Sequence, residues 1–247
     1  MRIDIVTIFP GYFASPLSES LVFRAIEAEI LDVHLVDLRG FAEAPHWKVD
    51  DEPYGGGPGM VMAAPPLFRA VEALRAESPS PHVVYLSPQG RRFDASVARE
   101  LAGRERVALF CGRYEGIDER ARQGGLFDEE ISLGDFVLSG GEAAALAILE
   151  AVSRFLPGVV GDAESVRLDS FEDGLLDYPH YTRPREFRGL AVPEEVISGH
   201  HERIRAWRRR EQLLATARCR PDLLRNVALT AEERALVEGV APRRDPK

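Results

Sequence analysis

Four short glycine-containing segments constrain what the first part of this chain can fold into. They lie at residues 54–60, 86–90, 111–116 and 138–142. Because glycine lacks a Cβ and adopts positive φ angles without strain, such segments let backbones approach one another or a flat ligand closely. Singly, each is more often a plain turn than a ligand contact. Together, each beside a predicted strand or helix, they favour a small-molecule site built from main-chain groups.

The glycines do not match the usual nucleotide-binding patterns. A dinucleotide fingerprint reads G-x-G-x-x-G, and here Gly55 and Gly57 are followed by Met60 where the third glycine belongs. A Walker loop places a lysine after glycine, but neither lysine of the chain, Lys48 or Lys247, follows one. Phosphate-driven nucleotide binding is therefore disfavoured.

Apolar segments and amphipathic segments alternate over the same part of the chain. Strand patterns occur at residues 3–9, 33–38, 83–86 and 107–111, and helical patterns at 17–28, 66–77, 94–102 and 142–155. This alternation predicts an α/β fold with a mainly parallel sheet flanked by helices. Ligands of such sheets bind beyond the carboxyl ends of the strands, where two of the glycine-containing segments begin.

The alternation ends near residue 160. We predict an α/β domain over residues 1–160, an acidic flexible linker over residues 161–177, and a small helical domain over residues 178–247. The last helix is expected to begin at a capping box at Thr230 and to end at Gly239.

The helical domain carries a local excess of positive charge. Its long helix, expected at about residues 200–218, places Ile204, Trp207 and Leu214 on one face. Between residues 200 and 220 there are seven arginines and two glutamates, although the whole chain has a formal charge of −9. Such a run is usually a solvated helix face. Beside aromatic residues it can instead contact RNA phosphates.

The composition is that of an ordinary globular protein. A hydrophobic content of 45% over 247 residues supports a sizeable core. The N-terminal apolar run is too short for a signal peptide, and no segment approaches the roughly 20 apolar residues that span a bilayer. We therefore expect a cytoplasmic protein without membrane association. Cys111 and Cys219 lack zinc or disulfide spacing, so no metal ligands are assigned.

Six longer motifs resemble one protein family. They read DDEPYGGGPGMVM, LSPQG, GRYEGIDER, SLGDFVLSGGE, YPHYTRP and SGHHERIRAW, beginning at residues 50, 86, 112, 132, 178 and 198. In this order they are similar to the bacterial tRNA (guanine-N1)-methyltransferases of the TrmD type, members of the SPOUT class. The resemblance covers essentially the whole chain.

The resemblance implies a homodimer whose active site is shared between subunits. It also implies a trefoil knot at the C-terminal end of the N-terminal domain, which binds S-adenosylmethionine. The implied cofactor-binding residues are Leu86, Ser87, Pro88, Gly112, Tyr114, Glu115, Leu133, Gly134, Asp135, Phe136, Val137, Leu138, Gly140 and Gly141. The family usually has a proline at the position of Ala144, so this chain departs from its pattern at the entry to the following helix.

The implied reaction is methyl transfer to N1 of the tRNA guanosine immediately 3′ to the anticodon, position 37. Guanine N1 carries a proton, so the reaction needs a base at N1 and a cation or donor at O6. By resemblance, Asp169 is the base and Arg154 stabilises charge on O6, with Mg²⁺ assisting. From its residues alone, Asp169 is one of six acids in the predicted linker, and Arg154 is a cation near a helix C-terminus.

The expected RNA-binding residues are His180 and Arg183, in the fifth motif, and Arg208 and Arg209, in the arginine-rich helix. Two other functions stay open at this point. The chain can be a SPOUT-type methyltransferase for another RNA nucleotide or a ribose hydroxyl, which would not need Asp169 and Arg154 in these roles. It can also be a non-catalytic RNA-binding factor, although that function gives no reason for four glycine-containing segments.

Overall fold

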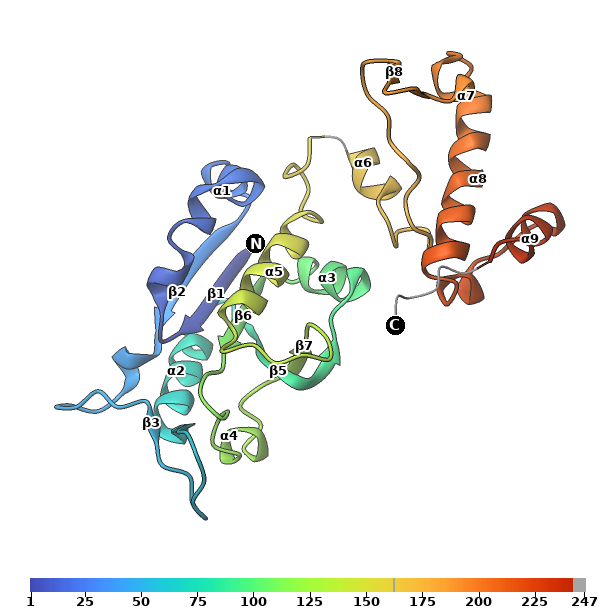
Figure 1. Cartoon of the computed structure of the whole chain (residues 1–247). Helices are drawn as coiled ribbons and strands as arrows, with labels where there is room; N and C mark the ends of the chain where they lie inside the picture. The colour runs from blue at the N-terminus through green and yellow to red at the C-terminus, as the bar shows by residue number, and fades with distance from the viewer. Residues whose placement is uncertain (162, 242–247) are drawn as a thin grey trace. The chain divides into compact units, whose positions relative to one another are not determined.

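The computed structural model describes residues 1–161 and 163–241, and the chain divides into two compact units (Figure 1). Unit 1 is Met1–Gly161 and unit 2 is Asp162–Lys247. This division falls next to the boundary expected at residue 160. The end of the predicted helical domain, residues 242–247, lies outside the described residues.

A five-stranded parallel sheet forms the centre of unit 1, with strand order β2-β1-β6-β5-β7. The strands are β1 (Arg2–Thr7), β2 (Asp32–Asp37), β5 (His82–Arg92), β6 (Arg106–Cys111) and β7 (Glu129–Ser132). β6 is buried at every position, as expected of an apolar strand covered on both faces. The predicted α/β fold with a mainly parallel sheet is thereby confirmed.

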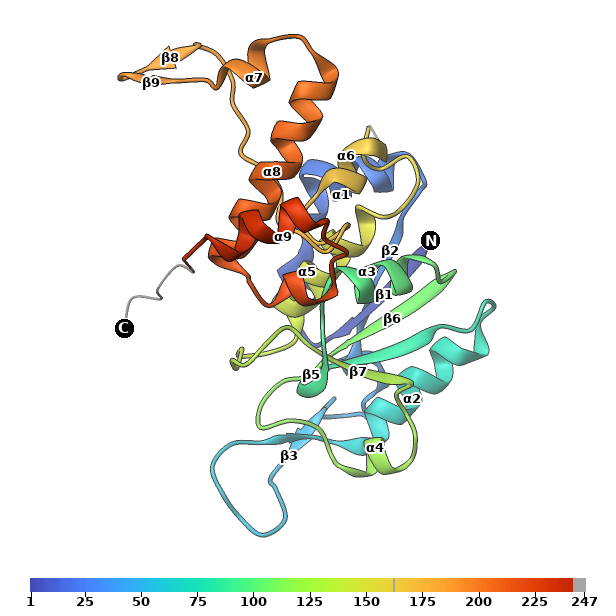
Figure 2. The same cartoon turned by 90° about the vertical axis from the view of Figure 1, so that its right-hand side faces the viewer.

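Helices cover both faces of this sheet (Figure 2). One layer consists of α1 (Ser20–Glu27), α3 (Ala95–Ala102) and α5 (Glu142–Ser153), and the other of α2 (Ala64–Ala76), α4 (Arg120–Gln123) and the 3₁₀ turn η3 (Leu38–Phe41). Phe13 and Ile148 belong to the first apolar cluster, and Leu67 and Phe110 to the second. Burial of each such side chain stabilises the fold by about 1.5–3 kcal/mol.

β7 is absent from the sequence-based strand assignment. It is four residues long, and its first two, Glu129 and Glu130, form ion pairs with Arg91 and Arg122 at 2.8 and 2.7 Å. Only Ile131 provides a buried apolar side chain in this strand. A strand with one apolar residue has no alternating pattern that sequence reading can detect.

β5 continues beyond the end predicted at residue 86. It pairs with β7 on both sides of a register shift, and both Leu86 and Arg91 face Ile131. The residues between them, 87–90, leave the ladder as a bulge. A smaller hairpin of β3 (Asp50–Asp51) and β4 (Val61–Met62) encloses the first glycine-containing segment, and the 3₁₀ turns η1 (Pro10–Phe13) and η2 (Pro16–Ser18) follow β1.

Unit 2 is mostly helical, as predicted. Its elements are α6 (Ala163–Leu168), the hairpin of β8 (Glu186–Phe187) and β9 (Leu190–Ala191), α7 (Glu194–Ile197), α8 (His201–Cys219), η4 (Leu223–Asn226) and α9 (Ala231–Glu238). The predicted capping box is confirmed, because Glu233 N donates to Thr230 Oγ1 at 3.1 Å and Thr230 N donates to Glu233 Oε2 at 2.9 Å. On α8, Leu213 is fully buried, whereas the expected Leu214 is half-buried.

The segment predicted as a linker, residues 161–177, has structure of its own over residues 163–177, and residue 162 lies outside the described residues. It contains α6, and Leu175 near its end is 2% exposed. Leu176 N donates to the Thr216 hydroxyl on α8 at 2.9 Å. The last part of this segment therefore packs as part of unit 2. No helix within residues 1–161 and 163–241 combines the length and apolarity that crossing a bilayer requires.

Candidate active site

A pocket opens in unit 1 beside the bulge of β5 and the carboxyl ends of β6 and β7, the edge at which parallel sheets bind ligands. It encloses about 180 Å³. Every residue predicted to bind the cofactor lines it except Asp135, which is exposed and, among the residues the structure describes, stands outside the lining. The lining residues that the prediction missed are Tyr85, Arg113, Gly116, Ile131, Ser132, Ser139 and Ala144.

The pocket walls approach one another closely at Gly140 and Gly141, where an added Cβ would lie under 3 Å from a neighbouring atom. A Cβ at Gly140 would lie 2.1 Å from Arg113 Nε, and one at Gly141 would lie 2.7 Å from the Cα of Cys111. Gly141 N also donates to Gly112 O at 2.9 Å. The segments after β6 and before α5 are therefore joined backbone to backbone.

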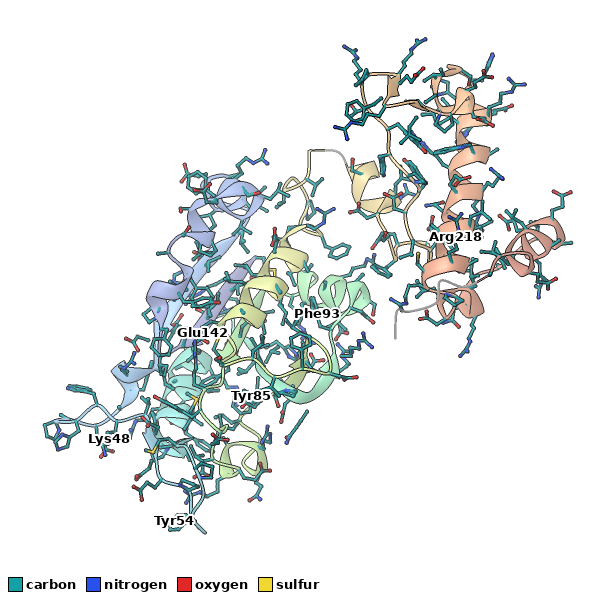
Figure 3. All side chains as sticks on the ribbon, in the orientation of Figure 1. Lys48, Tyr54, Tyr85, Phe93, Glu142 and Arg218 are labelled. Carbon is teal, nitrogen blue, oxygen red and sulfur yellow. The ribbon has the colours of Figure 1, made fainter. Side chains whose placement is uncertain are left out.

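The segment at residues 54–60 behaves differently from the other three. Gly55, Gly56 and Gly57 have positive φ angles, and a Cβ on any of them would meet open space. The fully exposed Tyr54 lies in this loop (Figure 3). Only the end of the segment reaches the pocket wall, where Glu115 N donates to Met60 O at 3.0 Å.

Tyr85 forms part of the pocket floor. Its side chain is 4% exposed, and burial raises the pKa of its phenol to about 12. It is therefore neutral near pH 7. The Arg122 guanidinium lies over the ring at 5.2 Å and pairs with Glu130 at 2.7 Å. Tyr85 directly precedes the LSPQG motif. Its position near the end of the predicted strand was the sequence feature that could have indicated a pocket-lining residue.

Apolar side chains surround the pocket without being buried. Tyr114, Phe136, Val137 and Leu138 are 46%, 53%, 84% and 40% exposed. A cluster of exposed large apolar groups around a cavity is typical of a surface that a ligand or another protein covers. The site thus combines an apolar rim with main-chain polar groups.

Arg154 lies at the other end of α5. It is the C-cap residue of this helix and is half-buried. A guanidinium there interacts favourably with the helix C-terminus. Arg154 does not line the pocket formed by the described residues.

Asp169 directly follows α6 in unit 2 and is half-buried. Its carbonyl accepts from Glu172 N at 3.3 Å, and Phe171 N donates to Leu175 O at 2.7 Å, so this carboxylate lies at the start of a local turn. Asp169 and Arg154, the two residues expected to be catalytic, belong to different units.

Aromatic side chains and one arginine cluster on unit 2. The Tyr178 ring lies 4.7 Å from the His180 ring and 6.4 Å from the Trp207 ring, and Tyr181 lies 6.1 Å from Trp207. The Arg208 guanidinium lies over Tyr178 at 4.8 Å. We name these five residues the aromatic cluster. It brings the YPHYTRP motif together with the arginine-rich helix.

The other expected RNA-binding residues have different surroundings. Arg209 Nε donates to Glu233 Oε1 at 2.7 Å, which joins α8 to α9. His180 Nε2 lies 2.8 Å from Asp177 Oδ2. Arg183 is exposed, close in sequence to the β8–β9 hairpin. Within residues 1–161 and 163–241, no group of three or more histidines, cysteines or acids is arranged to hold a metal ion.

Comparison with known proteins agrees with this architecture. Residues 1–226 match the model of the family described as tRNA (Guanine-1)-methyltransferase TrmD. The chain is 52% identical over 235 residues to the tRNA (guanine-N(1)-)-methyltransferase of Geobacter sulfurreducens, covering 95% of each protein. It is 53% identical over 245 residues to that of Moorella thermoacetica, covering 98% of each.

A solved structure is also similar. The crystal structure of tRNA (m1G37) methyltransferase from Aquifex aeolicus matches with a TM-score of 0.74 and 41% identity, covering 91% of this chain and 95% of that one.

Proposed function

Because this chain belongs to the tRNA (guanine-1)-methyltransferase family, we propose that its pocket binds S-adenosylmethionine for methyl transfer to N1 of guanosine 37 in tRNA. The protein is an enzyme that methylates tRNA. One observation carries the proposal: the pocket beside the bulge of β5 and the ends of β6 and β7 is built mostly from the motifs that resemble the family.

The residues present fit S-adenosylmethionine. Its adenine is flat and apolar on both faces, which suits the rim of Tyr114, Phe136, Val137 and Leu138. Its polar edges suit the main-chain groups of the pocket segments that contain Gly112, Gly140 and Gly141. When bound, the cofactor supplies an electrophilic methyl group on a sulfonium.

The acceptor determines what the chain must provide. An aspartate has a pKa near 3.9, and if guanine N1–H is about five units less acidic, full deprotonation costs roughly 7 kcal/mol. The proton must therefore leave as the new bond forms, or the carboxylate must be desolvated. We assign Asp169 to accept the N1 proton. We assign Arg154 to stabilise the negative charge that grows on O6, a contribution of about 3–4 kcal/mol.

A homodimer with a shared active site accommodates these assignments. The proposed base belongs to unit 2 and the pocket to unit 1, so a base from one subunit can serve the pocket of the other. Exposed apolar residues of unit 1, among them Phe9, Tyr12 and Val137, are available for contact with a second copy. We also assign the trefoil knot to the pocket segments, in line with the similar fold.

Unit 2 supplies the proposed tRNA contacts. In the aromatic cluster, Arg208 and His180 suit phosphates and unstacked bases. Arg183 adds an exposed charge. Arg209 already pairs with Glu233, so we place the phosphate contact on Arg208 first. The protein would act in the cytoplasm, where tRNA is processed.

The family resemblance also implies that Mg²⁺ assists transfer. The described residues present no three-ligand group for it, so the roles above are assigned to the chain's own side chains.

Product mapping tests the proposal. Purified protein is incubated with labelled S-adenosylmethionine and unmodified tRNA transcripts that carry guanosine or adenosine at position 37. We expect label at N1 of guanosine 37 and none in the adenosine transcript. Label on a ribose or on another nucleotide would replace this function with another methyltransferase activity. Absence of saturable S-adenosylmethionine binding would favour a non-catalytic RNA-binding factor.

A further inference from the structure

Glu142 is a fully buried acid next to the pocket. It is the first residue of α5, directly after Gly141 (Figure 3). Its side chain is 0% exposed. Acids are almost never fully buried unless they are paired. An acidic side chain at a helix N-terminus interacts favourably with the helix dipole. Among the described residues, Glu142 does not line the pocket itself.

The carboxylate of Glu142 connects three separate segments. Thr7, the last residue of β1, donates from Oγ1 to Glu142 Oε1 at 2.7 Å. Arg113, in the segment after β6, places Nη2 2.9 Å from Glu142 Oε2. Because Glu142 also begins α5, the end of β1, the segment after β6 and the start of α5 meet at one side chain.

Arg113 carries this connection into the pocket wall. It lines the pocket, and its Nη1 donates to Ser139 O at 3.2 Å. Its guanidinium also lies 4.6 Å from the centre of the Phe9 ring. A Cβ at Gly140 would lie 2.1 Å from Arg113 Nε, so a side chain there would displace the arginine. The Arg113 side chain is thus in direct contact with the Ser139–Gly140 backbone.

The contact between Glu142 and Arg113 leaves polar atoms incompletely satisfied. Although the two groups form an ion pair, Arg113 Nε and Glu142 Oε2 are both buried and find no hydrogen-bond partner in the described part of the chain. Unsatisfied buried groups are rare and costly, and their presence calls for an explanation beyond stability. Here they lie at the wall of the proposed binding pocket.

We infer that Glu142 is a positioning residue for the cofactor: it orients the Arg113 guanidinium, which in turn holds the Ser139–Gly141 backbone in its binding conformation. The inference rests on the proposed function, because it takes S-adenosylmethionine as the ligand. Glu142 acts through Arg113 and touches no reacting atom. The alternative is that this ion pair only stabilises the fold.

The chain contains a matched control for that alternative. Asp4 lies on the same strand as Thr7, is also 0% exposed, and pairs with Arg106 at 2.7 Å. Asp4 is near the start of β1 and Arg106 is the first residue of β6, so this pair lies at the end of the sheet away from the pocket. Replacing either buried acid by its amide removes one charge at constant size.

Isothermal titration of the full-length protein with S-adenosylhomocysteine, without RNA, tests the inference. We expect Glu142→Gln to raise Kd at least tenfold and Asp4→Asn to leave it within twofold of wild type, although both lower Tm. Methylation assays should show a raised KM for S-adenosylmethionine and a kcat within threefold of wild type at saturation. In an Arg113→Met background, Glu142→Gln should raise Kd no further.

Several outcomes overturn the inference. It fails if Glu142→Gln binds S-adenosylhomocysteine like wild type, or if Asp4→Asn weakens binding equally. If Glu142→Gln does not fold, Thr7→Val removes one of the carboxylate's contacts and should raise Kd about threefold, and unchanged binding by that variant also refutes the role. A wild-type protein that binds no S-adenosylhomocysteine overturns the proposed function, and this inference with it.

Discussion

The Nε of Arg209 donates to Glu233 Oε1 at 2.7 Å, so an arginine of α8 is held by the capping box of α9. Arg208, the preceding residue, makes no ion pair within the described residues and lies over the Tyr178 ring at 4.8 Å. Two adjacent arginines therefore have different partners. Neutralising them separately distinguishes a structural charge from an RNA-binding one.

Arg209→Gln should reduce stability in a pH-dependent way. The guanidinium lowers the pKa of Glu233 below its usual value, so the stabilisation is present above the unfolded-state pKa and is lost as pH falls through the lower folded-state pKa. Because the pair is partly exposed, we expect a loss of less than about 1 kcal/mol near neutral pH. Urea unfolding at pH 7 and below pH 4 should show that the difference in free energy of unfolding between wild type and Arg209→Gln is smaller in acid. A free-energy difference that does not change with pH would contradict this prediction.

Arg208→Gln should weaken tRNA binding and reduce the slope of log K against log salt by about 1. The lost interaction is a phosphate contact, so the loss should not depend on tRNA sequence. Filter binding across a salt series measures the slope, with Arg209→Gln as the control of equal charge. An unchanged slope for Arg208→Gln would identify its charge as a solvated helix face.

Asp169→Asn should strongly slow methyl transfer and leave cofactor binding intact. An amide cannot accept the N1 proton, and general-base catalysis contributes about 10²–10⁴-fold. Single-turnover assays with saturating tRNA measure the rate, and titration with S-adenosylhomocysteine measures binding. Asp173→Asn, in the same acidic segment, is the matched control and should retain activity. Near-normal turnover of Asp169→Asn would remove this residue from the mechanism.

Arg154→Ala should slow the single-turnover rate by about 10²–10³-fold through loss of charge stabilisation at O6. The variant also loses a cation at the C-terminus of α5, which costs about 0.3–1 kcal/mol. Thermal unfolding separates the two effects. An unchanged single-turnover rate with a reduced Tm would show that Arg154 only stabilises the C-terminus of α5.

Gly140→Ala should impair cofactor binding, because its Cβ would lie 2.1 Å from Arg113 Nε and displace the pocket wall. Gly40→Ala is the matched control, since a Cβ there meets nothing within 4 Å. We expect at least a tenfold rise in the Kd of S-adenosylhomocysteine for Gly140→Ala and less than twofold for Gly40→Ala. Equal affinities of the two variants would show that the pocket wall accommodates a methyl group at residue 140 without loss of binding.

The parallel sheet was predictable because apolar strand patterns, such as Ile3, Ile5 and Val6 in β1 and residues 107–111 in β6, alternate with helical patterns. β7 was not, because two of its four residues are glutamates that pair with arginines. The linker assignment was incomplete for a similar reason: Leu175 is buried, and its neighbour Leu176 donates to Thr216 on α8, far along the chain. Short segments owe their structure to partners elsewhere in the chain, which local patterns do not reveal.

Much of the candidate site was predictable because the family motifs are continuous stretches of sequence. Arg113 lay inside one such motif, yet its role depends on Glu142 and Ser139, which come from another. Likewise, nothing near Arg209 in sequence indicates that Glu233 is its partner. Pairings over such separations follow from the fold and not from spacing.

The bulge in β5 has a consequence for how this pocket can diversify. Leu86 and Arg91 both face Ile131, so residues 87–90 form a loop whose two ends are anchored to one neighbouring strand. An inserted or deleted residue there changes the loop length but shifts neither flanking register. Changes within residues 87–90 can therefore alter this part of the cavity wall while both flanking registers in the sheet stay fixed.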